Sequence, residues 1–376
     1  MAHRKGGGMK FVVLGGAGDM GSEVVADLSG FLPESKVIIV DLRKDVAEKK
    51  AKSIGLSNIA VEQCDVNKRN DVLRILKGAD VVVNCVGPFY KYEKVILPLA
   101  IEAGVGYVDI CDDHDATERA LSYSDMARSN NVTALIGMGW TPGITNVLAR
   151  YGANKLDTVE SINIYWVGSI ADSEGLAVTK HVFHVIQGTA PSYEDHQWID
   201  VDALSGNEDV EFPEPIGVQN AYYVGHPEPV TIARYIKGVR NVTLKGTLLP
   251  KDINKLGKFL VDTDAVSTEK KLHAVSEFLS GDMVVLSNIF GSKDKPLPVS
   301  GLRVDVHGTQ SGKPKTYSWG AIDSMSRLTG IPASIGAQMM ATGMIKQVGV
   351  IPAEACIDPE YFIEELEKRD IEIEEM

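Results

Sequence analysis

The chain has 376 residues, of which 36 are glycine, 44% are hydrophobic and 24% are charged. This length predicts two domains, and the composition is that of an ordinary globular protein, which excludes disordered and collagen-like classes. The net charge of −13 argues against nucleic acid and anionic membrane as partners, because both require basic patches. No apolar run is long enough for a membrane-spanning helix. Four widely spaced cysteines, without a zinc-type pairing, predict reduced thiols in a cytoplasmic protein.

The first two-fifths of the chain alternates between short β-branched runs and amphipathic stretches. We predict strands at 10–15, 36–41, 59–64, 80–87, 106–111 and 132–139, and helices near 19–30, 44–54, 68–77, 93–103 and 115–130. Uniformly apolar strands are typical of strands buried on both faces. Their alternation with helices predicts an α/β Rossmann fold with a doubly wound parallel sheet. The eight residues before Met9, MAHRKGGG, lack the apolar core of a signal peptide and are expected to form a flexible extension.

A glycine-rich turn follows the first predicted strand. In the segment 15–21, GGAGDMG, the glycines at 16, 18 and 21 form a GxGxxG pattern that opens a helix. Asp41 ends the second strand 20 residues later, as the dinucleotide-binding fingerprint requires. The helix N-terminus offers free N–H groups and a positive dipole end to a pyrophosphate. The residues predicted to bind the cofactor phosphates are Gly16, Ala17, Gly18, Asp19, Met20 and Gly21.

Four further positions bear on the cofactor. The carboxylate of Asp41 can accept both ribose hydroxyls of NAD and would repel the 2′-phosphate of NADP, so we expect NAD. Arg43 can instead receive that phosphate, which keeps NADP open as the alternative. Asp65 and Val66, after the third strand, are placed to flank the adenine, and Asp65 can equally cap the helix that follows.

Loops at the carboxyl ends of the later strands are candidate sites for the reacting groups, because ligands of open α/β sheets bind there. Val86, Gly87 and Pro88 form a turn against which a nicotinamide could lie, or a simple strand-to-helix turn. Asp112, Asp113 and His114 are candidate proton donors or acceptors, since neighbouring carboxylates raise one another's pKa. The two aspartates can equally be N-cap or first-turn acids of the next helix. The alternating side-chain directions argue against a metal site here, and no metal is expected.

Several segments resemble the saccharopine dehydrogenase family. They are GGAGDMG (15–21), NCVGPFY (84–90), YVDICDD (107–113), GWTPGITN (139–146) and most of the tail from 329 to 371. The family includes saccharopine reductases, lysine 6-dehydrogenases and carboxynorspermidine dehydrogenases. The resemblance implies NAD(P)-dependent hydride transfer at a C–N bond of an amino-acid substrate such as saccharopine or lysine.

The resemblance also implies a domain organisation. A dinucleotide-binding domain at 9–145 would precede a substrate-binding and dimerisation domain at 146–325, an α+β domain built on an open mixed sheet. A C-terminal helical segment at 326–376 would return to the Rossmann domain, and the protein would be a homodimer.

The central region is less regular. Strand-like runs lie at 160–168, 221–225, 240–249, 300–310 and 315–321, and helical patterns lie near 176–187, 252–261 and 268–280. We expect the polar stretch 189–217 to be rich in loops and the segment 225–229, with its two prolines, to form an irregular loop.

The candidate substrate-binding residues are Tyr90, Lys180, His181, His184 and Arg234. Lys180 and His184 share one helix face and could present a cation and an imidazole, or belong to a solvated surface. His226, Glu228 and Arg234 form a second group, in which Arg234 could clamp a substrate carboxylate or pair with an acid of the surface. Two other functions stay open: a non-catalytic dinucleotide sensor, and a Rossmann dehydrogenase that acts on a non-amine substrate.

Overall fold

The computed structural model describes residues 8–172, 175–289 and 297–376. Most of the expected N-terminal extension, residues 1–7, lies outside the described residues. The chain forms two compact units. Unit 1 comprises 8–111, 115–144 and 329–358, and unit 2 comprises 112–114, 145–328 and 359–376 apart from the undescribed positions. Within the described ranges, no helix is both long and apolar enough to cross a bilayer.

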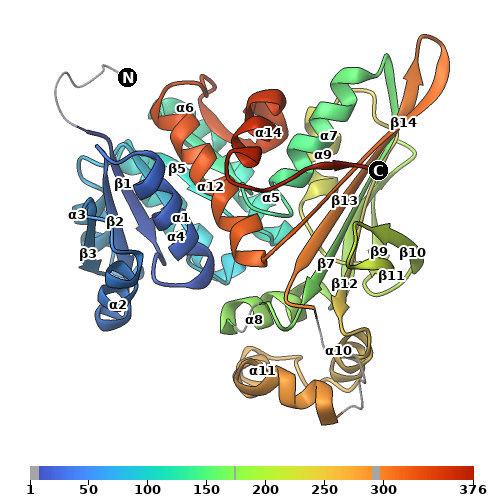
Figure 1. Ribbon diagram of the computed structural model, residues 1–376, viewed down its shortest axis with the longest axis horizontal. Helices are drawn as coiled ribbons and strands as arrows, with labels where there is room; N and C mark the ends of the chain where they lie inside the picture. The colour runs from blue at the N-terminus through green and yellow to red at the C-terminus, as the bar shows by residue number, and fades with distance from the viewer. Residues whose placement is uncertain (1–7, 173–174, 290–296) are drawn as a thin grey trace. The chain divides into compact units, whose positions relative to one another are not determined.

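Unit 1 is built on a seven-stranded parallel sheet (Figure 1). Its strands are β1 (Lys10–Leu14), β2 (Lys36–Asp41), β3 (Ile59–Gln63), β4 (Val81–Asn84), β5 (Gly106–Asp109), β6 (Thr133–Ile136) and β15 (Gly349–Pro352). The spatial order is β15-β6-β5-β4-β1-β2-β3, and each neighbouring pair runs parallel. From β1 the chain adds β2 and β3 on one side of the sheet and then β4, β5 and β6 on the other. The carboxyl ends of β1 and β4 therefore flank the switch point where ligands of such sheets bind. The predicted doubly wound sheet is confirmed.

The helices of this part of the chain follow the predicted positions closely. They are α1 (Asp19–Phe31), α2 (Lys44–Ile54), α3 (Arg69–Leu76), α4 (Phe89–Glu102), α5 (His114–Ser122), α6 (Ser124–Ser129), α12 (Met325–Ala341) and α13 (Ala353–Cys356). The single helix expected near 115–130 is divided, because α5 ends at Ser122 and α6 begins at Ser124. The four cysteines are free thiols, as predicted.

The tail is tied to the first helix and to the sheet of unit 1. Gly330 of α12 lies so close to α1 that a Cβ there would come within 2.7 Å of the Met20 carbonyl oxygen. Ser334 and Gln338 each donate a hydrogen bond to Asp27 of α1, at 2.5 and 3.1 Å. The tail also adds β15 beside β6, where the sequence analysis predicts only helix. Four apolar residues are too few for periodicity to separate a buried strand from a helix.

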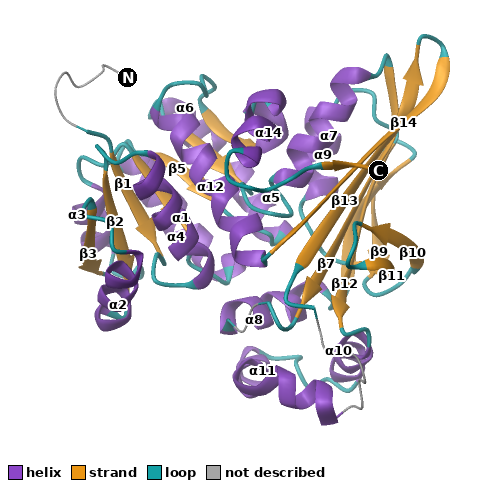
Figure 2. Cartoon of the chain, in the orientation of Figure 1, coloured by secondary structure: helices purple, strands orange, loops and turns teal. Residues whose placement is uncertain are grey.

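Unit 2 is built on a mixed sheet (Figure 2). Its strands are β7 (Thr158–Ser169), β8 (Thr189–Glu194), β9 (Gln197–Asp202), β10 (Glu208–Phe212), β11 (Gly217–Tyr223), β12 (Asn241–Leu249), β13 (Ser300–Gln310), β14 (Lys313–Asp323) and β16 (Glu374–Glu375). The main path is β10-β11-β12-β7-β13-β14-β16; β8 pairs with β12 and β9. Only the β12–β7 pair is parallel among those described. The accompanying helices are α7 (Ile144–Lys155), α8 (Leu176–Val185), α9 (Glu228–Tyr235), α10 (Asp252–Asp262), α11 (Glu269–Ile289) and α14 (Pro359–Glu367).

Two expectations for the central region are wrong. The stretch 189–217 is not loop-rich, because it contains β8, β9 and β10. Its polarity reflects an exposed edge: nearly all of β9 faces solvent, so polar residues there do not exclude a strand. The segment 225–229 is irregular only at its start, since α9 begins at Glu228. Pro229 fits the first helical turn, where its missing N–H leaves no hydrogen bond unmade.

Glu93 is a buried acid of α4 with an unusual titration. Its side chain is fully buried, and one oxygen lies 3.5 Å from Arg119 Nε. Burial, aided by the charge of Asp109, raises the pKa of Glu93 to about 8 despite Arg119. Folding therefore opposes ionisation of the Glu93 carboxyl. The free energy of unfolding falls for this reason as the pH rises from about 4.5 to about 8.

We therefore expect Glu93→Gln to stabilise the fold by about 2 kcal/mol at neutral pH, because the neutral amide avoids this cost. Urea unfolding at several pH values measures the effect. Glu102→Gln, an exposed position of the same helix that pairs with Arg69, is the matched control and should change stability little. An equal pH dependence of wild type and Glu93→Gln would contradict the assignment.

Candidate functional site

The turn between β1 and α1 forms a cradle that only glycine permits. A Cβ at Gly21 would lie 2.3 Å from the Gly15 carbonyl oxygen, and one at Gly16 would lie 3.0 Å from the Val13 carbonyl oxygen. The N-cap residue of α1, Gly18, makes no side-chain cap, which leaves the first-turn N–H groups available to a phosphate. The residues at this turn thus fit the pyrophosphate of a dinucleotide.

The ends of β2 and β3 carry the predicted ribose and adenine contacts. Asp41 Oδ1 accepts a hydrogen bond from the Arg43 backbone N–H at 3.0 Å, and the exposed Arg43 guanidinium lies 3.9 Å from the same carboxylate. Asp65 accepts bonds from the backbone and side chain of Asn67, which lower its pKa. Asp65 thus caps a turn ahead of α3 and is not the N-cap of that helix, which is Lys68. Val66 packs against the hydrophobic core of unit 1.

A buried hydrogen-bond network joins the ends of β4, β5 and β6. Asn84 Nδ2 donates to Tyr107 Oη at 3.0 Å, and Tyr107 Oη donates to Asp109 Oδ2 at 2.9 Å. Asp109 Oδ1 accepts from the backbone N–H groups of Cys111 at 3.1 Å and Gly137 at 2.7 Å. All three side chains are fully buried. The network fixes the loop that leads to Asp112 and the glycine-rich turn after β6.

The loop after β4 is held by the same network. The Val86 N–H donates to Asn84 Oδ1 at 3.1 Å, and the chain passes through Gly87 and Pro88 into α4. Tyr90 lies in the first turn of α4, where its carbonyl oxygen accepts a bond from Arg119 Nη2 at 3.2 Å. The predicted nicotinamide turn is thus a defined strand-to-helix connection of unit 1.

Within unit 2, His181 of α8 bridges two carboxylates. Its Nδ1 lies 2.9 Å from Asp113 Oδ1, and its Nε2 lies 3.2 Å from Asp112 Oδ2. Burial alone lowers the pKa of His181, but Asp112 and Asp113 outweigh that effect and raise it to about 9. Burial raises the pKa of Asp112, while the charge of His181 opposes the rise. At neutral pH His181 is therefore an imidazolium held between acids.

The same three residues could be read as a metal site, since their ligand atoms lie within 4.8 Å of one another. A metal needs a neutral imidazole with a free lone pair. Here each ring nitrogen of His181 faces a separate carboxylate, and the raised pKa keeps a proton on both. The arrangement therefore favours hydrogen bonds from a protonated His181 to the two carboxylates over a metal ion held by the three side chains.

A second histidine lies beside the first. The ring of His226 meets the ring of His181 edge-on, with centroids 5.3 Å apart, and lies 5.6 Å from the ring of Trp166 on β7. Its Nδ1 is 3.5 Å from Glu228 Oε2, and Glu228 Oε1 accepts a bond from Thr145 Oγ1 at 3.2 Å. His226 and Glu228 are both almost completely buried. We call Asp112, Asp113, His181, His226 and Glu228 the carboxylate–histidine cluster.

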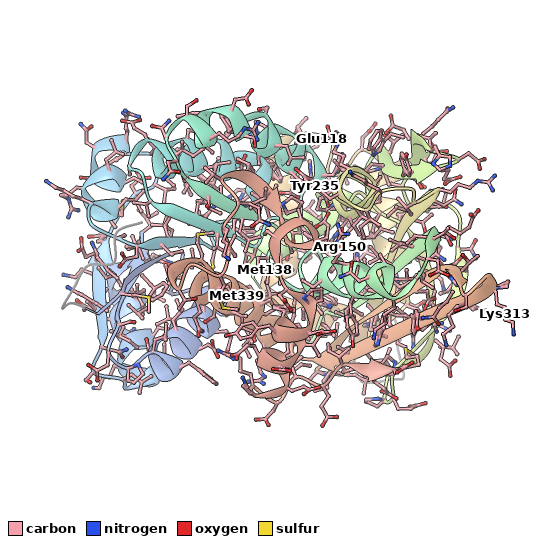
Figure 3. All side chains as sticks on the ribbon, turned by 90° about the horizontal axis from the view of Figure 1, so that it is seen from above. Glu118, Met138, Arg150, Tyr235, Lys313 and Met339 are labelled. Atoms are coloured by element: carbon pink, nitrogen blue, oxygen red, sulfur yellow. The ribbon has the colours of Figure 1, made fainter. Side chains whose placement is uncertain are left out.

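Helices α7 and α9 position Glu228. In addition to the Thr145 bond, Asn146 Nδ2 donates to Thr231 Oγ1 at 3.3 Å, and Arg150 Nη2 donates to the Tyr235 carbonyl oxygen at 2.5 Å. Figure 3 shows Arg150 and Tyr235 side by side. These bonds join the first half of α7 to the whole length of α9, so the start of α9 is held in place beside α7. Asn146 belongs to the GWTPGITN segment, and this contact gives that segment a structural role.

The remaining candidates of the central region have other partners. Lys180 Nζ bonds to Glu269 Oε1 of α11 at 3.3 Å, and the His184 ring stacks with the His114 ring at 6.3 Å. Arg234 is exposed and lies over the ring of Trp198, 5.5 Å from its centroid. The structure thus brings His181 together with Asp112 and Asp113, but it places Lys180, His184 and Arg234 elsewhere. Trp166 carries no sequence signal that could have placed it at the cluster, whereas Thr145 belongs to the GWTPGITN segment, whose resemblance to the family is the signal that could have found it.

Comparison with known proteins decides the family. Residues 11–135 match the model of the saccharopine dehydrogenase NADP binding domain, and residues 139–371 match that of the saccharopine dehydrogenase C-terminal domain. The chain belongs to the saccharopine dehydrogenase family. The resemblance seen in the sequence is confirmed, and with it the activity of an NAD(P)-dependent oxidoreductase that acts at C–N bonds.

Individual members of the family align over most of the chain. Carboxyaminopropylagmatine dehydrogenase of Synechocystis sp. is 24% identical, with 95% of each chain covered. Carboxynorspermidine synthase of Vibrio alginolyticus is 22% identical over 76% of this chain and 74% of its own. The structure of saccharopine dehydrogenase (L-Glu forming) of Saccharomyces cerevisiae superposes with a TM-score of 0.71 at 15% identity, covering 98% of this chain and 99% of that one. The last comparison confirms the predicted two-sheet fold.

Proposed function

We propose that this family member acts on a secondary amine that carries positive charge in the part that binds unit 2. The carboxylate–histidine cluster is the observation that carries the proposal. It contains three carboxylates, of which Asp113 and Glu228 are fully buried, together with the imidazolium of His181. A group of buried carboxylates favours a cation as its ligand. An ammonium or guanidinium group of the substrate would supply that cation.

The relatives support this substrate class. Two relatives, one aligned over 95% of each chain and one over about three quarters of each, are named for carboxyaminopropylagmatine and carboxynorspermidine. Both compounds are carboxylate-bearing derivatives of amines. Saccharopine, for which the structural relative is named, and lysine stay in the class as further candidates. Roles in lysine metabolism, the cytoplasmic location and the homodimer stay predictions, and sedimentation analysis tests the last of them.

In this proposal each unit has its own task. The glycine turn and Asp41 of unit 1 bind NAD, which when bound accepts a hydride from the substrate carbon. The carboxylate–histidine cluster of unit 2 attracts the cationic amine by its charge and exchanges protons with it. Asp112 and Asp113, together with the imidazolium between them, set the charge that the substrate meets.

A screen of nicotinamide absorbance tests the proposal. The purified protein is given NAD or NADP with carboxyalkylated polyamines, saccharopine, lysine, hydroxy acids and sugars. We expect turnover with amines, and a KM for cationic amines that rises at least about tenfold in Asp113→Asn because one negative charge is lost. Turnover of a hydroxy acid or sugar with none of any amine would overturn the proposal. Tight NAD binding without turnover of any compound would favour a dinucleotide sensor.

The preference for NAD is a separate prediction. Asp41→Ser removes the carboxylate that repels a 2′-phosphate, so the ratio of kcat/KM for NAD to that for NADP should fall by at least about tenfold. Asp45→Ser, an exposed acid near the start of α2, is the control and should leave the ratio unchanged. A ratio that stays constant in Asp41→Ser would show that another residue selects the cofactor.

A further inference from the structure

His226 differs in its bonding from His181, the other histidine of the cluster. His181 has a carboxylate at each ring nitrogen, whereas within the described residues neither ring nitrogen of His226 makes a hydrogen bond. Its side chain is only 3% exposed. Leaving such a group buried and unsatisfied costs about 1–3 kcal/mol, and native proteins tolerate that cost mainly where the group has a task.

The surroundings of His226 suit a group that gains and loses a proton. Asp112 and Asp113, from the loop after β5, and His181 of α8 lie on one side, with the His181 ring edge-on at 5.3 Å. The carboxylate of Glu228, at the start of α9, lies 3.5 Å from Nδ1. The indole of Trp166 packs on the ring from β7. Glu228 can steady an imidazolium at Nδ1, which leaves Nε2 for a ligand.

We propose that His226 is the acid–base residue of the reaction, that its Nε2 contacts the substrate nitrogen, and that Glu228 orients it. The inference rests on the proposed function, because it requires an amine substrate at the cluster. His181, locked between two acids, supplies a constant positive charge, while His226 is the imidazole whose protonation state changes during turnover.

The proton steps balance as follows. In the oxidative direction Nε2 takes one proton from the substrate ammonium, so that the nitrogen lone pair can form the C=N bond as the C–H bond gives its hydride to NAD. Water then adds to the carbon, and the C–N bond breaks with a proton delivered to the leaving nitrogen. The products are one primary ammonium ion, one carbonyl compound, NADH and one released proton. A single histidine that accepts, donates and accepts again meets these needs.

Trp166 provides a readout that needs neither cofactor nor turnover. A protonated imidazole in contact quenches indole fluorescence, so a titration of the wild type should show an inflection as His226 loses its proton. His226→Gln and Trp166→Phe should each remove that inflection. A cationic amine bound at Nε2 disfavours the imidazolium, so a saturating carboxyalkylated polyamine should move the midpoint to lower pH by about one unit. His273→Gln, an exposed position of α11, should leave the titration unchanged.

Kinetics supply the second readout. His226→Gln should lower kcat by about 100-fold or more, and should remove one limb of the pH profile. Its dissociation constant for NAD should stay within about twofold of the wild type, because the nucleotide contacts lie in unit 1. In His226→Ala, added imidazole should restore part of the lost rate, as it would not for a residue with a purely structural role.

The outcomes separate the two proposals. A wild type that oxidises amines while His226→Gln keeps its kcat and its pH profile would overturn the role of His226 alone. A fluorescence midpoint that does not move when the amine binds would also overturn it. A wild type without activity towards any amine would overturn the proposed function and, with it, this role.

Discussion

Gly18→Ala, Gly21→Ala and Gly30→Ala, three identical changes at the start, first turn and end of α1, should have three different results. At Gly21 the new Cβ would meet the Gly15 carbonyl oxygen at 2.3 Å, so backbone must move, and both stability and cofactor binding should fall. We expect a loss of about 2–3 kcal/mol of unfolding free energy. NAD should bind at least about 100-fold more weakly, because the phosphate cradle moves with the helix.

Gly18→Ala separates binding from folding. Its Cβ would lie 3.4 Å from the nearest atom, and its backbone is extended with φ of −75°, so the fold should accept the change. The methyl group would nevertheless stand where a pyrophosphate approaches the backbone, and we expect at least tenfold weaker binding, about 1.4 kcal/mol. Calorimetric NAD titration and urea unfolding measure the two effects.

Gly30→Ala is the matched control, since nothing lies within 4 Å of its added Cβ. Alanine inside a helix should stabilise the protein by about 0.5–1 kcal/mol and leave NAD binding unchanged. Equal binding by Gly18→Ala, Gly21→Ala and Gly30→Ala would show that the turn does not hold the cofactor.

His181→Gln should remove a large, pH-dependent share of the stability of the protein. The folded-state pKa of about 9 lies above the ordinary 6.5, so the contribution is fully present below about pH 6.5 and is lost as the pH rises through about 9. The shift corresponds to about 3 kcal/mol. At neutral pH the variant also leaves Asp112 and Asp113 beside each other without the cation between them, which adds to the loss.

Urea unfolding between pH 6 and 10 measures this effect. The wild type should lose stability across the alkaline part of the range, and His181→Gln should be less stable at neutral pH with a flatter profile. His273→Gln, which is exposed on α11, should reproduce the wild-type profile. A His181→Gln variant as stable as the wild type would mean that the imidazolium is not held by the two acids.

The Rossmann part could be predicted in detail because its signals are local. Each of the first six strands contains a short apolar run, and the glycine turn with Asp41 follows a fixed spacing. The strands β8 and β9 were missed for the opposite reason. They form a hairpin in which β8 is half buried and the polar residues of β9 face solvent, and its turn residues Asp195 and His196 have positive φ values of 48° and 64°. Polar edge strands resemble loops in composition.

The local patterns established the fold class, the cofactor turn and, through the family segments, the type of reaction. Only the tertiary structure brought together the carboxylate–histidine cluster. Asp112 and Asp113 follow β5 and His181 lies in α8, so these acids meet the imidazole across 68 residues of chain or more. Glu228, at the start of α9, comes from a third segment of the chain. No periodicity encodes such a meeting, because it depends on how strands pair and helices pack after they have formed. The same packing directed Lys180 to Glu269 and Arg234 to Trp198, which the sequence pattern could not decide.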